Sequence, residues 1–540
     1  MSAIGNIPAP VNEPILSYAP GTPERDALQS TIASMGAEVA EIPVVVNGTD
    51  HHVGEAKGVF SPQRHQHRLA NLHGATPALL GEAIDGAVRA QREWSEWRFE
   101  DRAAVFLKAA ELLAGPWRQR LNAATLLGQG KTPHQAEIDS ACELIDFLRF
   151  NVHYAERLLH EQPMSSRNAW NRLDHRPLEG FVYAVTPFNF TAIGGNLPTA
   201  PALLGNVVLW KPSHTAALSN WLFHELLQEA GLPPGVIQFV PGNSVEVTEA
   251  LLASPHFAGL HFTGSTAVFR SLWRTSAEHL DRYRAYPRIV GETGGKDFIL
   301  AHPSADVAAF TTALLRGAYE YQGQKCSAAS RCYVPRSLWP EVRDRMAAGI
   351  AEMQVGDPAD FSVFVGAVID ERAWTKLDAV LAEARADSGV EIVAGGTSDR
   401  SEGWFIAPTF ARVDDPHHRM MREEFFGPIL TAYVYEDDQW ADVLRLVDTT
   451  AEYALTGAVF AQDRAAVVEA DRALRHAAGN YYVNDKCTGA VVGQQPFGGG
   501  RASGTNDKAG SILNLYRWIS PRTVKEVGDP PTDWRYPYLG

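Results

Sequence analysis

The stretch GFVYAVTPFNFTAIGGNLPTAPALLGNVVLWKPS (residues 180–213) determines the expected fold. It holds two short apolar runs, FVYAV and NVVLW, and a segment of helical length lies between them. Short, continuously apolar runs are typical of strands that are buried on both faces of a parallel sheet. Because parallel neighbours need a crossover connection, strand, helix and strand here predict a βαβ unit.

The same alternation continues further along the chain. GVIQFVPG (235–242) and FAGLHFTG (257–264) are further short apolar runs, and TAALSNWLFHELLQEAG (215–231) is a helical segment between runs. A second alternating set runs from RIVGETGGKDFILA (288–301) to about Asn484, and it includes a helical segment and the strand-like SRCYV. The pattern predicts an α/β fold with doubly wound parallel sheets.

The two ends of the chain differ from this centre. Residues 1–75 are punctuated by Pro and Gly and are expected to form an N-terminal arm. A helical pattern begins at Pro77, and Thr76 is the expected N-cap. The tail SILNLYRWISPRTVKEV (511–527) predicts two strands joined at Pro521, which suits a β-arm for contact between subunits.

Composition excludes several classes of protein. A length of 540 residues predicts two or three domains. With 48 basic and 63 acidic residues and no Lys/Arg cluster, no nucleic acid partner is expected. No apolar run approaches membrane-helix length, and the start shows neither a secretory nor a mitochondrial pattern, so a cytoplasmic location is expected without a membrane partner.

The cysteines and histidines suggest no metal. None of the four cysteines lies in a C-x-x-C pattern, and reduced thiols are expected; they are Cys142, Cys326, Cys332 and Cys487. The histidine pairs at 51–52 and 417–418 are expected to lie in solvated loops. The sequence therefore predicts no metal site.

Three residues are candidates for chemistry. Cys326 precedes small residues that would let a substrate approach, as a nucleophile requires. Glu292 lies between glycines at a strand end, where a carboxylate can act as a general base. Asn189 follows a strand and precedes a helix, so its amide can stabilise an oxyanion. Taken alone, these residues also fit a packing thiol, a solvated turn and a helix cap.

Two further motifs suit a nucleotide. WKPS ends a strand at the edge where α/β sheets bind ligands, and Lys211 and Ser213 there could hold ribose hydroxyls. FTGST (262–266) is a glycine turn that opens a helix, which can bind a phosphate through backbone N–H groups. Each motif alone also fits an ordinary surface lysine or strand-to-helix turn.

The order of these motifs, ending with EEFFGP at 423–428, resembles the aldehyde dehydrogenase superfamily over nearly the whole chain. The resemblance implies a Rossmann-like NAD domain, an α/β catalytic domain and a β-flap for oligomerisation. It implies that Cys326 is the nucleophile, Glu292 the base and Asn189 the oxyanion donor. The implied NAD-binding residues are Thr186, Lys211, Ser213, Gly264, Ser265, Glu424 and Phe426.

The resemblance also implies a division of the chain. We expect an N-terminal arm at 1–75 and an NAD-binding domain at 76–288, with part of the flap near 160–180. A catalytic domain is expected at 289–485. The anchor loop, the return to the NAD domain and the β-tail are expected at 486–540.

Longer strings, among them AEIDSACELIDFLRFN (136–151) and VGQQPFGGGRASGTNDKAG (492–510), resemble the single-function Δ1-pyrroline-5-carboxylate dehydrogenase branch of that superfamily. This branch oxidises L-glutamate γ-semialdehyde to L-glutamate with NAD, the second step of proline catabolism. The implied substrate-binding residues are Glu143, Phe190, Ser327, Gly489, Ala490 and Phe497. Glu143 matches an acid near the substrate ammonium, although a paired helix carboxylate is the other interpretation.

Three positions depart from the branch's pattern, and three other functions stay open. Ala490 stands where some relatives have Ser, Gly500 where a relative has Ala, and His214 where many NAD-specific relatives have an acid. The last departure leaves NADP open as coenzyme. Another carboxylate-bearing semialdehyde, such as succinate semialdehyde, a non-catalytic family member and a cofactor-free cysteine hydrolase are the alternatives. The expected partners are a small-molecule substrate and further copies of the chain, as a homodimer or a larger homo-oligomer.

Overall fold

The first large sheet grows out of the stretch at 180–213. A computed structural model describes residues 6–540 of the protein. The strands of this sheet are β2 (Val44–Val46), β3 (Thr49–His51), β7 (Phe181–Val185), β8 (Val207–Lys211), β9 (Ile237–Phe239), β10 (Phe257–Thr263) and β11 (Arg288–Glu292). Their order is β11-β10-β7-β8-β9-β2-β3, and the first five are parallel while β2 runs antiparallel to both of its neighbours.

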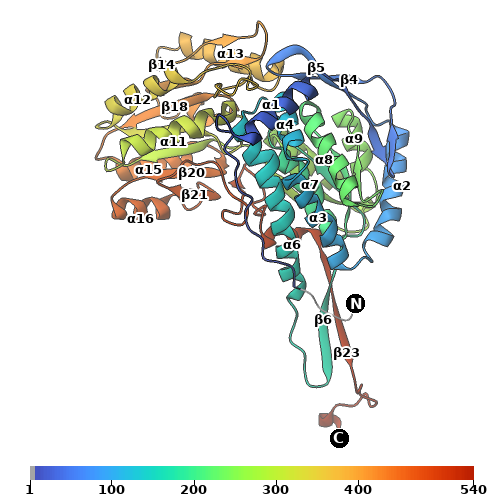
Figure 1. Cartoon of the computed structure of the whole chain (residues 1–540). Coiled ribbons are helices and arrows are strands. Elements are labelled where there is room, and N and C mark those ends of the chain that lie inside the picture. Colours follow the sequence, from blue (N-terminus) through green and yellow to red (C-terminus); the bar gives the residue numbers. More distant parts are fainter. Residues whose placement is uncertain (1–5) are drawn as a thin grey trace.

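Helices cover both faces of this sheet (Figure 1). Along β7, Phe181 and Tyr183 belong to one hydrophobic cluster, whereas Val182 and Ala184 belong to the cluster on the opposite face. Successive side chains of a strand point to opposite faces, so a strand covered on both sides has to be apolar throughout. The continuous apolar run in the sequence is the direct result of this double burial.

The second large sheet also has seven strands. They are β12 (Asp297–Ala301), β13 (Ala329–Pro335), β14 (Val390–Ala394), β17 (Thr409–Val413), β18 (Ile429–Tyr435), β20 (Thr456–Phe460) and β21 (Asn480–Val483). Their order is β14-β17-β18-β13-β12-β20-β21, and only the edge strand β14 is antiparallel. The predicted α/β class with parallel sheets is confirmed.

The helices connect the strands and build the outer layers. In the first half of the chain they are α1 (Pro23–Gly36), α2 (Pro77–Trp94), α3 (Phe99–Ala114), α4 (Arg118–Gln129), α5 (Pro133–Ala136), the π-helix Glu137–Glu143, α6 (Leu144–His160), α7 (Thr191–Leu203), α8 (Ala217–Ala230), α9 (Ser244–Leu252) and α10 (Thr266–Glu278). In the second half they are α11 (Val307–Tyr319), α12 (Trp339–Glu352), α13 (Glu371–Ala386), α14 (Arg419–Arg422), α15 (Trp440–Thr449), α16 (Arg464–Ala473) and α17 (Ile512–Leu515). Short 3-10 turns lie at His214–Ala216, Leu280–Arg282, Glu320–Gly323, Tyr516–Trp518 and Pro537–Leu539.

Smaller strands complete the structure. One small sheet is formed by β1 (Ala40–Ile42), β4 (Lys57–Ser61) and β5 (Arg64–Leu72), and two-stranded pairs are formed by β15 (Ser398–Asp399) with β16 (Phe405–Ile406) and by β19 (Tyr453–Ala454) with β22 (Gly500–Arg501). The antiparallel pair β6 (Ala169–Arg176) and β23 (Ser520–Val527) extends away from the body of the molecule (Figure 1). We call this pair the flap.

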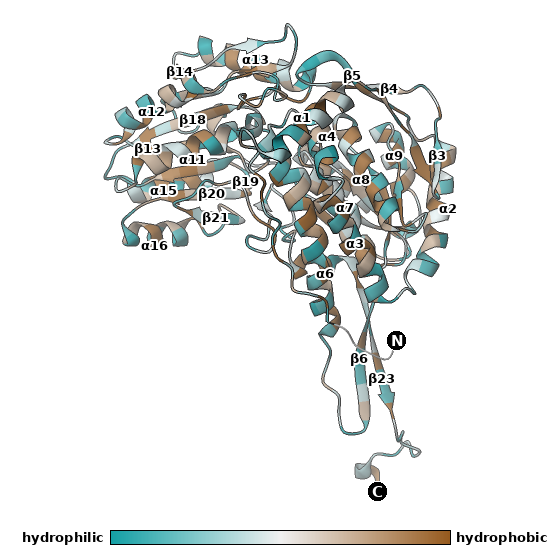
Figure 2. Ribbon diagram, viewed as in Figure 1, coloured by the Kyte–Doolittle hydropathy of each residue, from teal (hydrophilic) through white to brown (hydrophobic). Residues whose placement is uncertain are grey.

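Hydropathy follows this architecture. The hydrophobic colour gathers on the strands and on the inward faces of the helices (Figure 2). The predicted N-cap of α2 is confirmed, since the Thr76 hydroxyl accepts a hydrogen bond from the N–H of Leu79 at 3.3 Å. Within residues 6–540, no helix has both the length and the hydropathy needed to cross a membrane.

The predicted arm at 1–75 is wrong beyond about residue 20. Residues 6–19 lack helix and strand, but α1 follows, and β2 and β3 extend the first large sheet. The first five residues of the predicted arm lie outside the described part. The run Val44–Val46 is fully buried, yet three apolar residues among turn residues are too short to stand out as a strand in sequence.

Two other expectations need correction. The tail forms the short helix α17 and then one strand that runs through Pro521, not two strands. The Ser511 hydroxyl accepts from the N–H of Leu513, and this cap favours a helix where a strand was expected. The segment RIVGE, assigned to the second alternating set, forms β11 and pairs with β10 in the first sheet.

Candidate active site

A pocket of about 940 Å³ opens at the carboxyl ends of β7, β8 and β10. This is the edge of a parallel sheet where ligands bind. The pocket also reaches the turn before β13 and the segment before β18, so both large sheets contribute to its walls. It brings together nine of the predicted residues, namely Thr186, Asn189, Lys211, Ser213, Gly264, Ser265, Cys326, Glu424 and Phe426.

Cys326 lies between a strained turn and β13. The turn residues Tyr321, Gln322 and Gly323 all have positive φ angles (52°, 55° and 63°), and a Cβ at Gly323 would come within 2.3 Å of the Gly427 carbonyl oxygen. The thiol side chain is 8% exposed but still reaches the pocket. Burial raises the pKa of the Cys326 thiol well above its usual range, and the charge of Glu292 adds to this effect. The thiol therefore needs a base before it can react.

Asn189 is directed at the same turn. Its amide nitrogen donates a hydrogen bond to the carbonyl of Gln324 at 3.0 Å, and the side chain is buried. A primary amide carries two N–H groups, so one remains for a ligand. Since both Asn189 and Cys326 line the pocket, that N–H is suited to stabilise negative charge formed beside the thiol.

Glu292 ends β11 and is tied to a distant loop. Its carboxylate accepts a hydrogen bond from the N–H of Gly499 at 3.2 Å, and its backbone forms a bridge with Gly504. Burial raises the pKa of Glu292 well above that of an ordinary glutamate. A carboxyl group whose pKa lies closer to neutrality is a stronger base than an exposed one. Glu292 does not line the main pocket, although its charge acts on the Cys326 thiol.

Glu424 is held at the opposite wall of the pocket. The N–H of Gly295 donates to its carboxylate at 2.8 Å, and a Cβ at Gly294 would lie 2.3 Å from a carboxylate oxygen. Any side chain at position 294 would collide with the Glu424 carboxylate, so glycine is required there. Next to it, Phe426 has a φ of 62° and packs edge-on against Phe188 with ring centroids 5.8 Å apart.

The predicted nucleotide residues lie along the first sheet. Lys211 is buried, and burial lowers its pKa to about 8. The Ser265 hydroxyl accepts from the N–H of Val268 and so caps α10. The N–H of Gly264 donates to the Glu292 carbonyl at 3.2 Å, so this N–H is already engaged. His214 lies at the pocket wall with its ring against the Gly58 carbonyl at 3.0 Å.

The six predicted substrate residues lie outside the lining of this pocket. The hydroxyl of Ser327 is 2.8 Å from that of Thr488, which places it beside Gly489 and Ala490. Phe497 is fixed through backbone hydrogen bonds in both directions with Ala509. The anchor loop and the residue after the nucleophile are therefore brought together.

Phe190 and Glu143 adjoin a buried charged cluster that the sequence did not reveal. Lys131 pairs with Asp139 at 2.6 Å, and its ammonium lies 4.0 Å from the centroid of the Phe190 ring. Burial and the charge of Asp139 raise the pKa of Glu143 to about 8, while Lys131 and Lys325 oppose this shift. The polar residues of KTPHQAEID, within a segment of helical pattern, were the sequence feature that could have indicated this buried cluster.

Other pocket residues were also missed. One wall comes from segments within 55–74, and another comes from Pro241–Ser244 after β9. The second wall was detectable, because PGNS follows an apolar run just as TPFN and KPSH do. The first was not, because that part of the chain was expected to be an arm.

Comparison with known proteins agrees with this geometry. A family model described as "Aldehyde dehydrogenase family" matches residues 50–524. The chain belongs to the aldehyde dehydrogenase family. This family has the fold and the type of chemistry that the resemblance implied.

Individual relatives cover nearly the whole chain. A "Delta-1-pyrroline-5-carboxylate dehydrogenase, mitochondrial" of Dictyostelium discoideum is 52% identical over 540 residues, which cover 99% of this chain and 97% of the relative. The Homo sapiens protein of the same name is 49% identical over 529 residues, covering 98% and 94%.

Solved structures give the same result. The Delta-pyrroline-5-carboxylate dehydrogenase from Mycobacterium tuberculosis bound with NAD superposes with a TM-score of 0.97 at 51% identity, covering 100% of both chains. The 1-pyrroline-5-carboxylate dehydrogenase from Thermus with bound NAD has a TM-score of 0.91 at 30% identity, covering 97% of this chain and 100% of that one.

Proposed function

We propose that this chain oxidises L-glutamate γ-semialdehyde, the open form of Δ1-pyrroline-5-carboxylate, to L-glutamate with NAD, as the second step of proline catabolism. The observation that carries the proposal is the convergence of Cys326, Asn189 and Glu424 on one pocket at the strand ends. Relatives about 50% identical over almost the full length are named for this activity.

The residues present fit a dinucleotide. The pocket volume of about 940 Å³ is that of a site for a large ligand. We assign Lys211 and Ser213, which line the pocket, to the adenosine ribose, and we assign the pyrophosphate to the start of α10, where Gly264 and Ser265 also line the pocket. Thr186 also lines this wall. Glu424 and Phe426 line the same pocket, and we assign Glu424 to the nicotinamide ribose and Phe426 to packing near the nicotinamide.

The first half of the reaction belongs to the thiol. The Cys326 thiol gives its proton to water, and the thiolate attacks the aldehyde carbon, forming a C–S bond while the carbonyl oxygen becomes an oxyanion. The free N–H of Asn189 and the backbone N–H of Cys326 stabilise that oxyanion. When bound, NAD accepts the hydride that the aldehyde carbon loses. A thioester on Cys326 remains.

The second half belongs to Glu292. Its carboxylate takes a proton from water, and the resulting hydroxide attacks the thioester, so that the C–S bond breaks and the product acid leaves. The raised pKa of Glu292 supports this role, because a carboxylate with a higher pKa takes a proton from water more readily. Glu292 also favours hydrolysis over transfer of the acyl group to coenzyme A.

The substrate's own charges are anchored on two sides. We assign the α-carboxylate to Ser327 and to the backbone N–H groups of Gly489 and Ala490, which act locally in an acidic protein. Phe190 and Phe497 flank the aliphatic chain. We assign the α-ammonium to Glu143, whose carboxylate would accept its hydrogen bonds; this carboxylate lies buried near the charges of Asp139, Lys131 and Lys325.

We further propose that the flap pairs with a second copy, giving a homodimer or a larger assembly. Cytoplasmic location stays a prediction, since the D. discoideum and human relatives carry "mitochondrial" in their names.

The test is NADH formation, followed by absorbance, with Δ1-pyrroline-5-carboxylate and a panel of aldehydes that includes succinate semialdehyde. We expect a strong preference for Δ1-pyrroline-5-carboxylate and loss of activity in Cys326→Ser. Preference for another aldehyde would overturn the proposed substrate but would leave the proposed mechanism in place. Turnover without NAD would favour a hydrolase, and no reduction with any aldehyde would favour a non-catalytic protein. A parallel series with NADP tests the effect of His214.

A further inference from the structure

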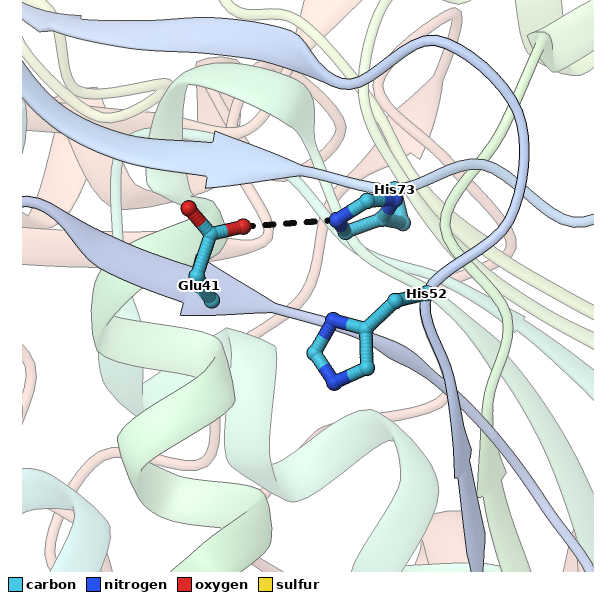
Figure 3. Close-up of side chains that lie close together, drawn as sticks. All are labelled: Glu41, His52 and His73. Carbon is cyan, nitrogen blue, oxygen red and sulfur yellow. Dashed lines mark hydrogen bonds and ion pairs between the residues drawn. The ribbon is translucent and has the colours of Figure 1, made fainter.

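Glu41, His52 and His73 converge outside the residues used above for chemistry (Figure 3). Glu41 belongs to β1, His52 follows β3, and His73 follows β5. One ligating atom from each side chain lies within 4.8 Å of the other two. Three separate segments thus present two imidazoles and a carboxylate to one point.

The contacts of His73 leave a lone pair directed at this point. Its Nδ1 lies 3.3 Å from the Val53 carbonyl, which can only accept a hydrogen bond, so Nδ1 carries the proton. In the neutral ring Nε2 is then an acceptor, yet it lies 3.3 Å from a carboxylate oxygen of Glu41. Two acceptors facing each other need a cation between them, either a second proton or a metal ion.

The distances suit a metal ion. Zinc binds His nitrogen and carboxylate oxygen at about 2.0–2.1 Å, and two such ligands 3.3 Å apart subtend an angle of roughly 107°, which is close to tetrahedral. His52 packs edge-on against His73 with ring centroids 5.0 Å apart. Because His52 is exposed, its side chain can rotate to complete the set without disturbing the core.

Outer contacts hold two of the three ligands. The amide of Asn71 donates to the second carboxylate oxygen of Glu41 at 2.6 Å, and the Val53 carbonyl fixes the tautomer of His73. Metal-binding histidines and carboxylates are oriented by contacts of this kind. A paired surface histidine would need neither the third ligand nor the Asn71 contact.

We propose that Glu41, His52 and His73 bind one divalent cation of the zinc class, with water in the fourth position. The bound ion links β1 to the segments that follow β3 and β5. His73 and Gly74 line the large pocket, so the ion lies beside the wall built from residues 55–74. The sequence predicted no metal here, because its three ligands are separated by 11 and 21 residues and form no local motif.

The test is binding of Zn²⁺ to the full chain, without a polyhistidine tag and in a Cys326→Ser background that removes the reactive thiol. Calorimetric titration and elemental analysis after dialysis give affinity and stoichiometry. His52→Ala is the main variant because that residue is exposed, and Glu41→Gln is the second. His51→Ala, at the neighbouring position in β3, is the matched control.

We expect one Zn²⁺ per chain, affinity at least about tenfold lower in His52→Ala and Glu41→Gln, and unchanged affinity in His51→Ala. Asn71→Ala should weaken binding by about tenfold, as loss of an outer contact does. X-ray absorption at the zinc edge should show two imidazoles in the parent and one in His52→Ala. No binding to the parent, or equal binding to His52→Ala and the parent, would overturn the proposal and leave only the contact between His73 and Glu41.

Discussion

At the scale of single residues, burial raises the pKa of both Cys326 and Glu292 above their usual values. At the thiol, the charges of Asp297 and Glu292 add to the effect of burial. A bound substrate has to supply the positive or electrophilic partner that makes proton loss favourable. The two groups therefore act in sequence, first the thiol and then the carboxylate.

Glu292→Gln should separate these two steps. The thioester still forms but water is no longer deprotonated, so one NADH per chain appears in a burst and the steady rate falls about 10²–10⁴-fold. Rapid-mixing absorbance measures the burst, and mass spectrometry detects the acyl group on Cys326. Wild-type kcat should fall at the acid end of the pH range and rise as the pH increases, because the raised pKa of Glu292 keeps more of the base protonated at low pH than an ordinary glutamate would be.

The control for this variant is Glu423→Gln, at an exposed carboxylate that pairs with Arg419. It should leave the rate unchanged. A steady rate for Glu292→Gln within a few-fold of wild type would remove Glu292 from the mechanism.

Glu143 gives a second pH-dependent prediction. Because its pKa lies at about 8, it is mostly protonated at pH 7 and becomes an anion as the pH rises through 8. The KM for the semialdehyde should fall over that range in wild type relative to Glu143→Gln. Dividing one KM profile by the other cancels the ring-opening equilibrium of the substrate. A ratio that is flat with pH would show that Glu143 does not contact the ammonium.

At the scale of secondary structure, the start of α7 depends on a buried ion pair. The N–H groups of Thr191 and Ala192 donate to Asp139 at 3.0 and 2.8 Å, and Asp139 also pairs with Lys131. Asn189 lies just before this helix start. The pair therefore fixes the segment that carries the oxyanion donor.

Asp139→Leu should be strongly destabilising, since it leaves Lys131 buried without a partner. We expect a loss of about 3–5 kcal/mol in the free energy of unfolding, measured by urea denaturation. The double variant Lys131→Met/Asp139→Leu should recover much of that loss. Asp101→Ala, which breaks an exposed pair with Arg98, should cost less than about 1 kcal/mol. Equal losses for the buried and the exposed pair would contradict this account.

Some helices and strands could be predicted from the sequence, and others could not. The unit β7–α7–β8 and the start of α2 were predictable, because double burial and an N-cap leave local signals. The strands β2 and β3 were not, since β2 joins the sheet by pairing with β9, almost two hundred residues later, and β3 joins it only through β2. The order of Asn189, Glu292 and Cys326 indicated the chemistry. Lys131 and Asp139 were missed because only the tertiary structure brings them to α7.

At the scale of the whole molecule, the flap extends far from the body, and the C-terminal segment continues beyond it (Figure 1). Its strands β6 and β23 pair over eight residues, and Trp170 on it is 59% exposed. A two-stranded ribbon is at best marginally stable in water by itself. The flap is therefore expected to be covered by another copy of the chain.

Truncation after Ile519 removes β23 and should convert the protein to monomers, as measured by light scattering coupled to gel filtration. Truncation after Val527 keeps the whole flap and should leave the assembly intact. If the shorter chain still forms an assembly with the same number of copies, other surfaces hold the copies together.

One bond described above also has a consequence for synthesis. The Glu292 carboxylate is held by the N–H of Gly499, which is 207 positions later in the chain. At about 5–20 residues per second, a ribosome needs roughly 10–40 s to cover that interval. Once Cys326 has been added during this time, a nascent chain contains its nucleophile but not yet Gly499, which holds its base. The contact that holds the base in place is therefore formed only near the end of translation.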